Sequence, residues 1–187
     1  METISFTRMA DGTREEYAFL TRLWEEHKQA HLAEQVLGLL TNMKGPTLGY
    51  KIDRYAHSLQ TATRALRDEA DEETVVCALL HDIGDTVAPD NHSDVAAAVL
   101  RPYVSERNHW VIKHHGLFQG YYYFHHIGGD RDARDRHRGH PHFEACVEFC
   151  ERWDQASFDP DYDTLPIEAF APMVRRLFAR APRGFED

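Results

Sequence analysis

Two stretches of the sequence place an aspartate in line with apolar residues at the spacing of a helix face. The residues in line are Val147, Cys150 and Asp154 in one stretch, and Val75, Leu79 and Asp82 in the other. Side chains three, four and seven positions apart share one side of an α-helix. Burying a carboxylate is unfavourable by several kcal/mol unless a cation or hydrogen bonds meet it. A fold that buries these two helix faces must therefore supply such partners around Asp82 and Asp154.

Helical periodicity, with Gly and Pro falling between the periodic segments, predicts an all-α chain, and no segment shows the alternation of a strand. A capping box formed by Thr13 and Glu16 opens the first helix. The further expected helices cover 33–41, 53–68, 71–83, 92–100, 106–115 and 141–156, and one more short helix is expected in the tail. Asn91 and Ser105 are the expected N-caps of the helices that follow them, and Pro141 is expected at the first position of its helix. Gly84 and Gly116 are expected to end the helices that precede them. Residues 116–141 are predicted to form a long loop or a broken helix.

Length and composition favour a single domain, because 187 residues with 42% hydrophobic side chains suit one compact core. We expect N-terminal helices in 1–45, a metal-binding core in 46–157, and a C-terminal arm and helix in 158–187. The formal net charge of −10 argues against a nucleic-acid partner, which needs a basic surface.

The sequence lacks the apolar stretch of about 18 residues that spans a bilayer, and its first residues do not resemble a signal peptide. Its three cysteines are too few and too scattered for a disulfide framework. We therefore expect a cytoplasmic protein with no membrane partner, and the sequence predicts no particular oligomeric state.

Histidine is frequent, with 13 residues, and several fall at the ends or on the core-facing sides of predicted helices. Together with the two aspartates they form a candidate metal-binding set: His57, His81, Asp82, His92, His115 and Asp154. A lone helical histidine is more often a surface or core residue than a ligand. The combination carries the argument here, because a His-Asp pair follows an apolar run and another histidine lies 24 residues upstream. Imidazole and carboxylate donors favour iron, manganese or zinc over calcium.

The histidines between 125 and 142 are interspersed with Arg and Asp, which is typical of a solvated, salt-bridged surface, with a second metal site as the alternative. Aromatic residues between 118 and 126 are interpreted either as core packing or as the wall of a pocket.

The motifs HSLQTA at 57–62 and ALLHDIGD at 78–85 resemble the metal signature of the HD-domain superfamily. The resemblance covers roughly residues 46 to 157 and implies an all-α, compact HD-domain helical bundle with a central dinuclear metal site. The additional histidines His92 and His115 resemble those of the mixed-valence diiron oxygenase branch, which includes the organophosphonate oxygenases and myo-inositol oxygenase.

Carried over by position, the resemblance implies that His57, His81, Asp82 and Asp154 hold one iron. Asp82 would bridge to a second iron, which His92 and His115 would also hold, with His114 as the alternative to His115. The implied cofactor is two Fe in the mixed-valence Fe(II)/Fe(III) state, with Mn, Mg, Ni or Zn as alternatives.

The implied activity is oxidation, or oxidative cleavage of a C–C or C–P bond, of a small polar molecule by O₂. The alternative is a metal-dependent HD phosphohydrolase acting on a phosphate ester or a nucleotide, and a non-catalytic metal-binding module is a third possibility.

The chain departs from the family pattern where a cation would meet an anionic substrate. Asp85 stands at the position of a common lysine, and Gln119 and Glu151 stand where basic residues are expected. An acidic pocket suits an amino- or ammonium-bearing substrate better than a phosphonate, unless a cation such as Arg152, Lys113, Arg131 or Arg134 compensates. Besides Asp82, the candidate catalytic residues are Tyr50 as a gate over the site, Asp85 and Gln119.

Overall fold

The structure is a computed structural model, and it describes residues 3–183. This part of the chain is all helical and contains no strand, as the sequence predicts. Residues 3–183 contain seven α-helices: α1 (Arg14–Thr41), α2 (Arg54–Arg67), α3 (Glu72–Leu80), α4 (His92–Leu100), α5 (Glu106–Tyr123), α6 (Phe143–Phe149) and α7 (Ile167–Phe178). Short helical turns lie at Met9–Asp11, Pro89–Asn91, Phe124–His126, Ala133–His137 and Cys150–Asp154. No helix within the described residues is long and apolar enough to cross a bilayer.

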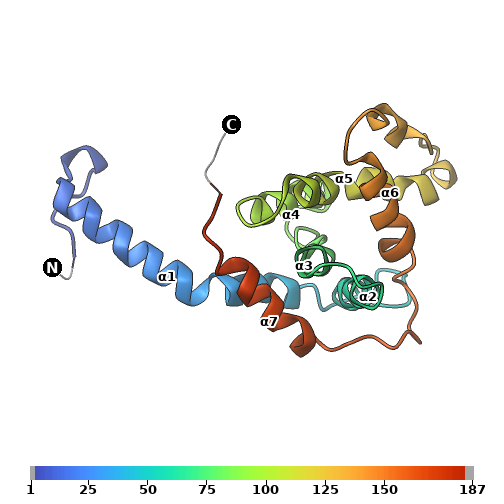
Figure 1. The fold of residues 1–187 in the computed structure, drawn as a ribbon, viewed down its shortest axis with the longest axis horizontal. Helices are drawn as coiled ribbons and strands as arrows, with labels where there is room; N and C mark the ends of the chain where they lie inside the picture. Colours follow the sequence, from blue (N-terminus) through green and yellow to red (C-terminus); the bar gives the residue numbers. More distant parts are fainter. Residues whose placement is uncertain (1–2, 184–187) are drawn as a thin grey trace.

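Helix α3 is the centre of the bundle (Figure 1), and every side chain from Thr74 to Leu80 is buried. A helix that is apolar on all sides needs partners on all sides. It packs against α2, α5 and α7. The end of α3, where His81 and Asp82 follow Leu80, therefore lies deep in the molecule.

Helix boundaries agree with the sequence where a side chain caps the helix. Thr13 and Glu16 form the expected capping box, and the Ser105 hydroxyl accepts a hydrogen bond from the backbone N–H of Asn108. Asn91 precedes α4, but its side chain makes no capping hydrogen bond. Pro141 is not the first helical residue, because α6 begins two positions later at Phe143.

Several predicted helix ends were wrong, and α3 ends at Leu80, before the expected end at residue 83. The segment from 14 to 41 is one continuous helix, because the residues between the two expected helices are good helix formers without Gly or Pro. Helix α5 also runs through Gly116 to Tyr123. Gly116 is a packing residue there, since a Cβ at this position would lie 2.8 Å from the Ser93 hydroxyl oxygen of α4. The predicted loop thus begins only after Tyr123.

The histidines after α5 pack against an aromatic ring instead of forming only a solvated surface. Trp110 lies between His114 and His140, with ring centroids 4.2 Å apart in both pairs. His137 contacts the edges of the Trp110 and His114 rings. In the described part of the chain, these histidines do not form a group that could hold a metal ion.

The helix begun by α6 does not continue as an α-helix to Ala156. Residues Cys150–Asp154 form a π-helical turn, and the backbone N–H of Gln155 donates to the carbonyl of Cys150, five residues back. Such turns are rare and often occur at functional sites. This one carries Asp154.

Candidate metal centre

Four imidazoles direct their Nε2 atoms into the middle of the bundle. His57 comes from α2, His81 from the end of α3, His92 from the start of α4 and His115 from α5. Each Nδ1 lies near a backbone carbonyl oxygen: 2.8 Å from His57 to Ser157, 2.8 Å from His81 to Ala78, 3.1 Å from His92 to Pro89 and 2.6 Å from His115 to Ile112. Because a carbonyl only accepts, Nδ1 donates, and the Nε2 of each neutral ring presents a lone pair.

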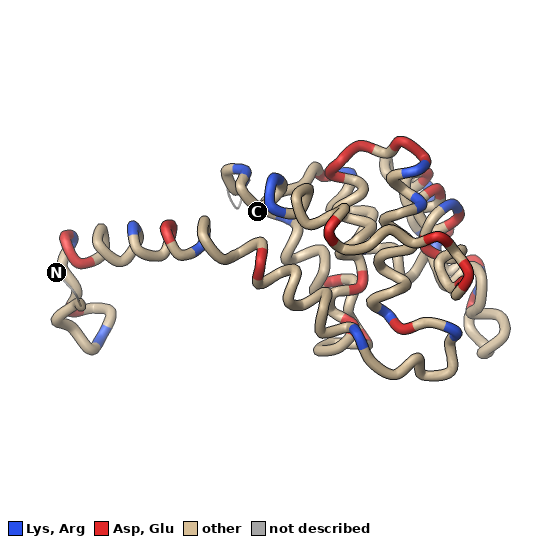
Figure 2. Tube along the Cα trace, turned by 90° about the horizontal axis from the view of Figure 1, so that it is seen from below, with Lys and Arg blue, Asp and Glu red and all other residues tan. Residues whose placement is uncertain are grey.

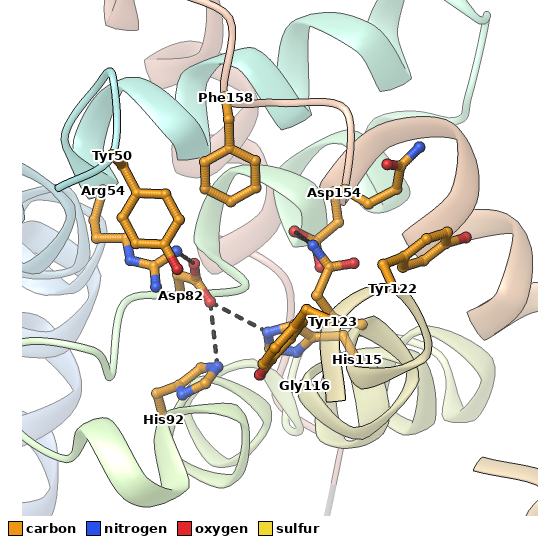
Figure 3. Close-up of a pocket in the computed structure, with 12 residues that line it drawn as sticks. Tyr50, Arg54, Asp82, His92, His115, Gly116, Tyr122, Tyr123, Asp154 and Phe158 are labelled. Carbon is orange, nitrogen blue, oxygen red and sulfur yellow. Dashed lines mark hydrogen bonds and ion pairs between the residues drawn. The ribbon is translucent and has the colours of Figure 1, made fainter. Parts of the chain in front are cut away.

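Asp82 stands between two pairs of these imidazoles. Its Oδ2 is 3.5 Å from the Nε2 of His57 and 3.3 Å from that of His81. Its Oδ1 is 3.4 Å from the Nε2 of His92 and 3.2 Å from that of His115. Figure 3 shows the second pair converging on the carboxylate. Each oxygen of one buried carboxylate therefore faces its own pair of histidines.

Asp154 completes the side that holds His57 and His81. Its Oδ1 is 3.2 Å from the Nε2 of His57 and 3.7 Å from that of His81, and it accepts a hydrogen bond from the Gln119 amide. Its Oδ2 is buried and has no hydrogen-bond partner among the residues that the structure describes. An unpartnered buried carboxylate oxygen is unfavourable, and a metal ion would satisfy it.

Both aspartates are held in the ionised form. Burial raises the pKa of Asp82, but the charges and hydrogen bonds of His81, His115 and His57 outweigh it and hold this pKa well below its usual range. Burial also opposes ionisation of Asp154, and hydrogen bonds from His57 and His81 lower its pKa nonetheless. Burial lowers the pKa of His81, yet Asp82 and Asp154 raise it well above the ordinary value. The cluster thus attracts positive charge.

The donor set fits metal ions. The Nε2 atoms of His57 and His81 are 3.1 Å apart, so two lone pairs would face each other unless a proton or a cation lies between them. Ligand atoms of His57, His81 and Asp154 lie within 4.8 Å of one another, as do those of His81, Asp82 and His115. Imidazole nitrogen with carboxylate oxygen is a donor set of first-row transition metals.

A cavity of about 300 Å³ opens over these side chains. Its wall combines ligand candidates with aromatic and amide groups (Figure 3): Tyr50, Arg54, Asp82, His92, His115, Gly116, Gln119, Tyr122, Tyr123, Asp154, Gln155 and Phe158. Phe158 stacks on the His57 ring with centroids 4.4 Å apart, and Tyr50 stacks on Phe158 at 5.1 Å. This size is at the lower end for small-molecule pockets.

Arg54 is a cation in this cavity that the sequence analysis missed. Its Nε is 2.8 Å from Oδ2 of Asp85, and its Nη1 is 3.8 Å from Oδ2 of Asp82. The guanidinium also lies over the Tyr50 ring, at 5.1 Å from its centroid. Asp85 is therefore an ion-pair partner, and it does not make the pocket acidic on its own.

The cations expected to compensate Asp85 lie elsewhere. Arg152 pairs with Glu148 and Asp68, while Arg131 and Arg134 lie over the ring of Tyr121. None of these arginines, nor Lys113, is among the residues that line the cavity.

Of the other predicted site residues, some line the cavity and others lie behind its wall. Tyr50 and Gln119 line the cavity, whereas Asp85 lies behind Arg54 and within 3.4 Å of the Nδ1 of His92. The Nδ1 of His114 bonds to the Trp110 carbonyl, and the His114 ring stacks on Trp110, so His115 is the member of this pair that faces Asp82.

Sequence signals existed for some of the residues that were missed. Arg54 lies one turn before His57 on the same face of α2. Tyr122 and Tyr123 continue the helical spacing of His115 and Gln119 once α5 is extended past Gly116. Phe158 follows the last helical turn of its segment, where periodicity gives no signal.

Residues 54–144 match the model of the HD domain family. No curated protein matches the chain. The matched segment includes the four converging histidines and Asp82, while Asp154 follows it. Over this segment, which forms the helical core around the site, the chain is similar to the HD domain family.

Proposed function

We propose that the chain is an HD-domain oxygenase that holds two iron ions and uses O₂ to oxidise a small polar molecule. The main support for this proposal is that each oxygen of Asp82 faces a different pair of histidines. His57, His81 and Asp154 would hold the first ion with Oδ2 of Asp82. His92 and His115 would hold the second ion with Oδ1 of the same carboxylate.

Iron ions held by these residues would supply binding and one-electron reduction of O₂, and the protein would supply orientation and exclusion of water. Phe158 covers His57 from the cavity side, and Tyr50 stacks on Phe158. Tyr50 is half exposed at the cavity edge, which suits a gate that limits water entry. Gln119 donates to Asp154 and orients that carboxylate.

The substrate is proposed to be a small organic anion. The acidic pocket expected from Asp85 favoured an ammonium-bearing molecule, but the Arg54–Asp85 ion pair removes that premise. Arg54 is about one-third exposed and faces the cavity, and a guanidinium matches the geometry of a carboxylate, phosphate or phosphonate. The four aromatic rings of the wall would contact the remainder of the molecule.

A metal-dependent phosphohydrolase is the second candidate. The first position alone, with His57, His81, Asp82 and Asp154, gives four donors for a single ion that could activate water. This candidate leaves the convergence of His92 and His115 on Asp82 without a role.

The test combines metal content with two activities. We expect two irons per chain and, in a partly oxidised sample, an EPR signal of a coupled Fe(II)/Fe(III) pair. We also expect O₂ consumption with a small phosphonate or carboxylate from a substrate panel that includes ammonium compounds. A single Mn, Ni or Mg ion, with phosphatase activity and no O₂ uptake, would establish the hydrolase instead.

A further inference from the structure

The first two thirds of α1, residues 14–31, project from the bundle as an isolated helical arm (Figures 1 and 2). Apart from Glu16, which closes the capping box, the buried residues of α1 all lie beyond the arm, at Val36, Leu37 and Leu40. An isolated helix of about 15 residues is only marginally stable in water. The arm therefore needs a partner surface to be a stable part of the fold.

The apolar side chains of the arm lie on the side of α1 that faces away from the chain's own core. Val36 and Leu40 lie on the face of α1 that packs into the core. Toward the N-terminus, the same face of the helix carries Gln29, Glu26 and Arg22, which are exposed and polar. The apolar and histidine side chains of the arm lie roughly opposite, about 170° around the helix axis. We call them the arm stripe: Leu20, Leu23, Trp24, His27 and His31.

The arm stripe is largely uncovered. Trp24 is 66% exposed and Leu23 40% exposed. The rings of His27 and His31 contact each other at 4.6 Å, and Trp24 stacks on His27. An exposed tryptophan beside leucines and imidazoles is the composition of a protein-binding surface.

The bundle carries a groove on the same side of α1, further along the helix. This α1–α7 groove has a volume of about 540 Å³ and is walled by Leu37, Gly38 and Thr41 of α1 and by Ile167, Ala171 and Pro172 of α7. A glycine inside a helix is unfavourable by about 1 kcal/mol relative to alanine. Space is open where a Cβ of Gly38 would project. Gly38 thus leaves a hole in the groove floor for a large side chain.

We propose that the arm stripe binds in the α1–α7 groove of a second copy of this chain, with the two α1 helices antiparallel across a two-fold axis. A chain cannot fill its own groove, because arm and groove belong to one continuous helix. Placing Trp24 of each copy at Gly38 of the other puts His31 on the axis, midway between them. The contact is then the same from both sides, as a two-fold dimer requires.

The register sets how far the two α1 helices overlap. With Trp24 opposite Gly38, residues 21–41 of the two copies lie side by side over about 31 Å, and a helix is about 10 Å wide. The two facing α1 surfaces would bury roughly 600 Å² in total, and the α7 walls of the two grooves add to this area.

The first experiment measures the mass of the full chain by light scattering and sedimentation at micromolar concentration. We expect twice the chain mass of 21.6 kDa. Trp24→Ser should raise the dimer dissociation constant roughly 30-fold or more, as for a central interface residue. The matched control is Glu26→Ser, on the face of the arm opposite the arm stripe, and it should leave the dimer dissociation constant unchanged. A wild-type chain that stays monomeric, or a dimer insensitive to Trp24→Ser, overturns the proposal.

The second experiment tests the register with cysteines, since Cys77, Cys146 and Cys150 are all buried. His31→Cys should form a disulfide-linked dimer by itself. Trp24→Cys and Gly38→Cys should each remain unlinked alone and should link when the two variants are mixed. Cross-linking of Trp24→Cys with itself would show arms paired with each other and would refute the groove. Trp24 and His31 are exposed, and a Cβ at Gly38 would project into open space. Circular dichroism reports whether each variant keeps its fold.

Discussion

Metal-dependent stability separates the two proposed ion positions. His92 contributes only to the second position, through the contact of its Nε2 with Oδ1 of Asp82. Asp82 contributes to both positions through its two oxygens. Replacing His92 with alanine should therefore remove one metal-dependent step of stabilisation, and replacing Asp82 with alanine should remove most of both.

The expected size follows from ligand linkage. At a free metal concentration 100 times the dissociation constant, one bound ion stabilises the folded state by about 2.7 kcal/mol. For a chain of this length, 1 kcal/mol shifts the melting temperature by about 2–4 °C. One ion should raise the melting temperature by about 5–11 °C, and two ions by roughly twice as much.

Scanning calorimetry with increasing Fe(II) under anaerobic conditions, alongside metal analysis, measures this shift. We expect the full shift in the wild type, about half in His92→Ala and little in Asp82→Ala. The matched control is His126→Ala, because this histidine is exposed and is not among the residues that line the cavity, and its shift should equal that of the wild type. An undiminished shift in His92→Ala with two ions still bound would refute the assignment of His92.

Three further results are expected. Arg54→Gln should weaken binding of methylphosphonate to the metal-loaded protein by roughly 10- to 150-fold in calorimetry, while Arg152→Gln should not. Hydrogen bonds from the backbone of Ser5 and Thr13 lower the pKa of Glu16 from 4.5 to about 2, so its stabilisation of the N-terminal capping box is complete above pH 4.5 and lost as the pH falls toward 2. Glu16→Gln should accordingly speed amide exchange in the first turns of α1 near neutral pH, with the difference from wild type vanishing near pH 2. Gly116→Ala should destabilise the fold by about 1–3 kcal/mol in denaturant titrations, because the added carbon crowds α4.

The sequence was most informative where function and helix geometry coincide. Asp82 and Asp154 are recognisable in the sequence because they interrupt apolar helix faces, and the structure places both beside histidine side chains in the core. The capping signals at Thr13 and Ser105 were also readable, because each depends on residues within one turn.

The features that the sequence could not predict depend on contacts between distant segments. In the sequence, Gly116 indicates a helix end, whereas in the structure it allows α4 to pack closely against α5. The sequence likewise does not distinguish Arg54 from a surface arginine, because its ion-pair partner Asp85 lies on another segment. The π-helical turn that carries Asp154 shifts the helix register by one residue, a change that the apolar spacing alone does not reveal.

The four imidazoles differ in how far their orientation is encoded locally. His81, His92 and His115 each donate from Nδ1 to the carbonyl three residues earlier, so their own backbone segments aim them. His57 instead donates to Ser157, one hundred residues away, and the segment that brings Ser157 also brings Asp154 and Phe158. The second ion position thus needs only the packing of α3, α4 and α5. The first position is complete only when the segment after α6 has packed against α2. Metal binding at the first position therefore depends on formation of the whole tertiary fold.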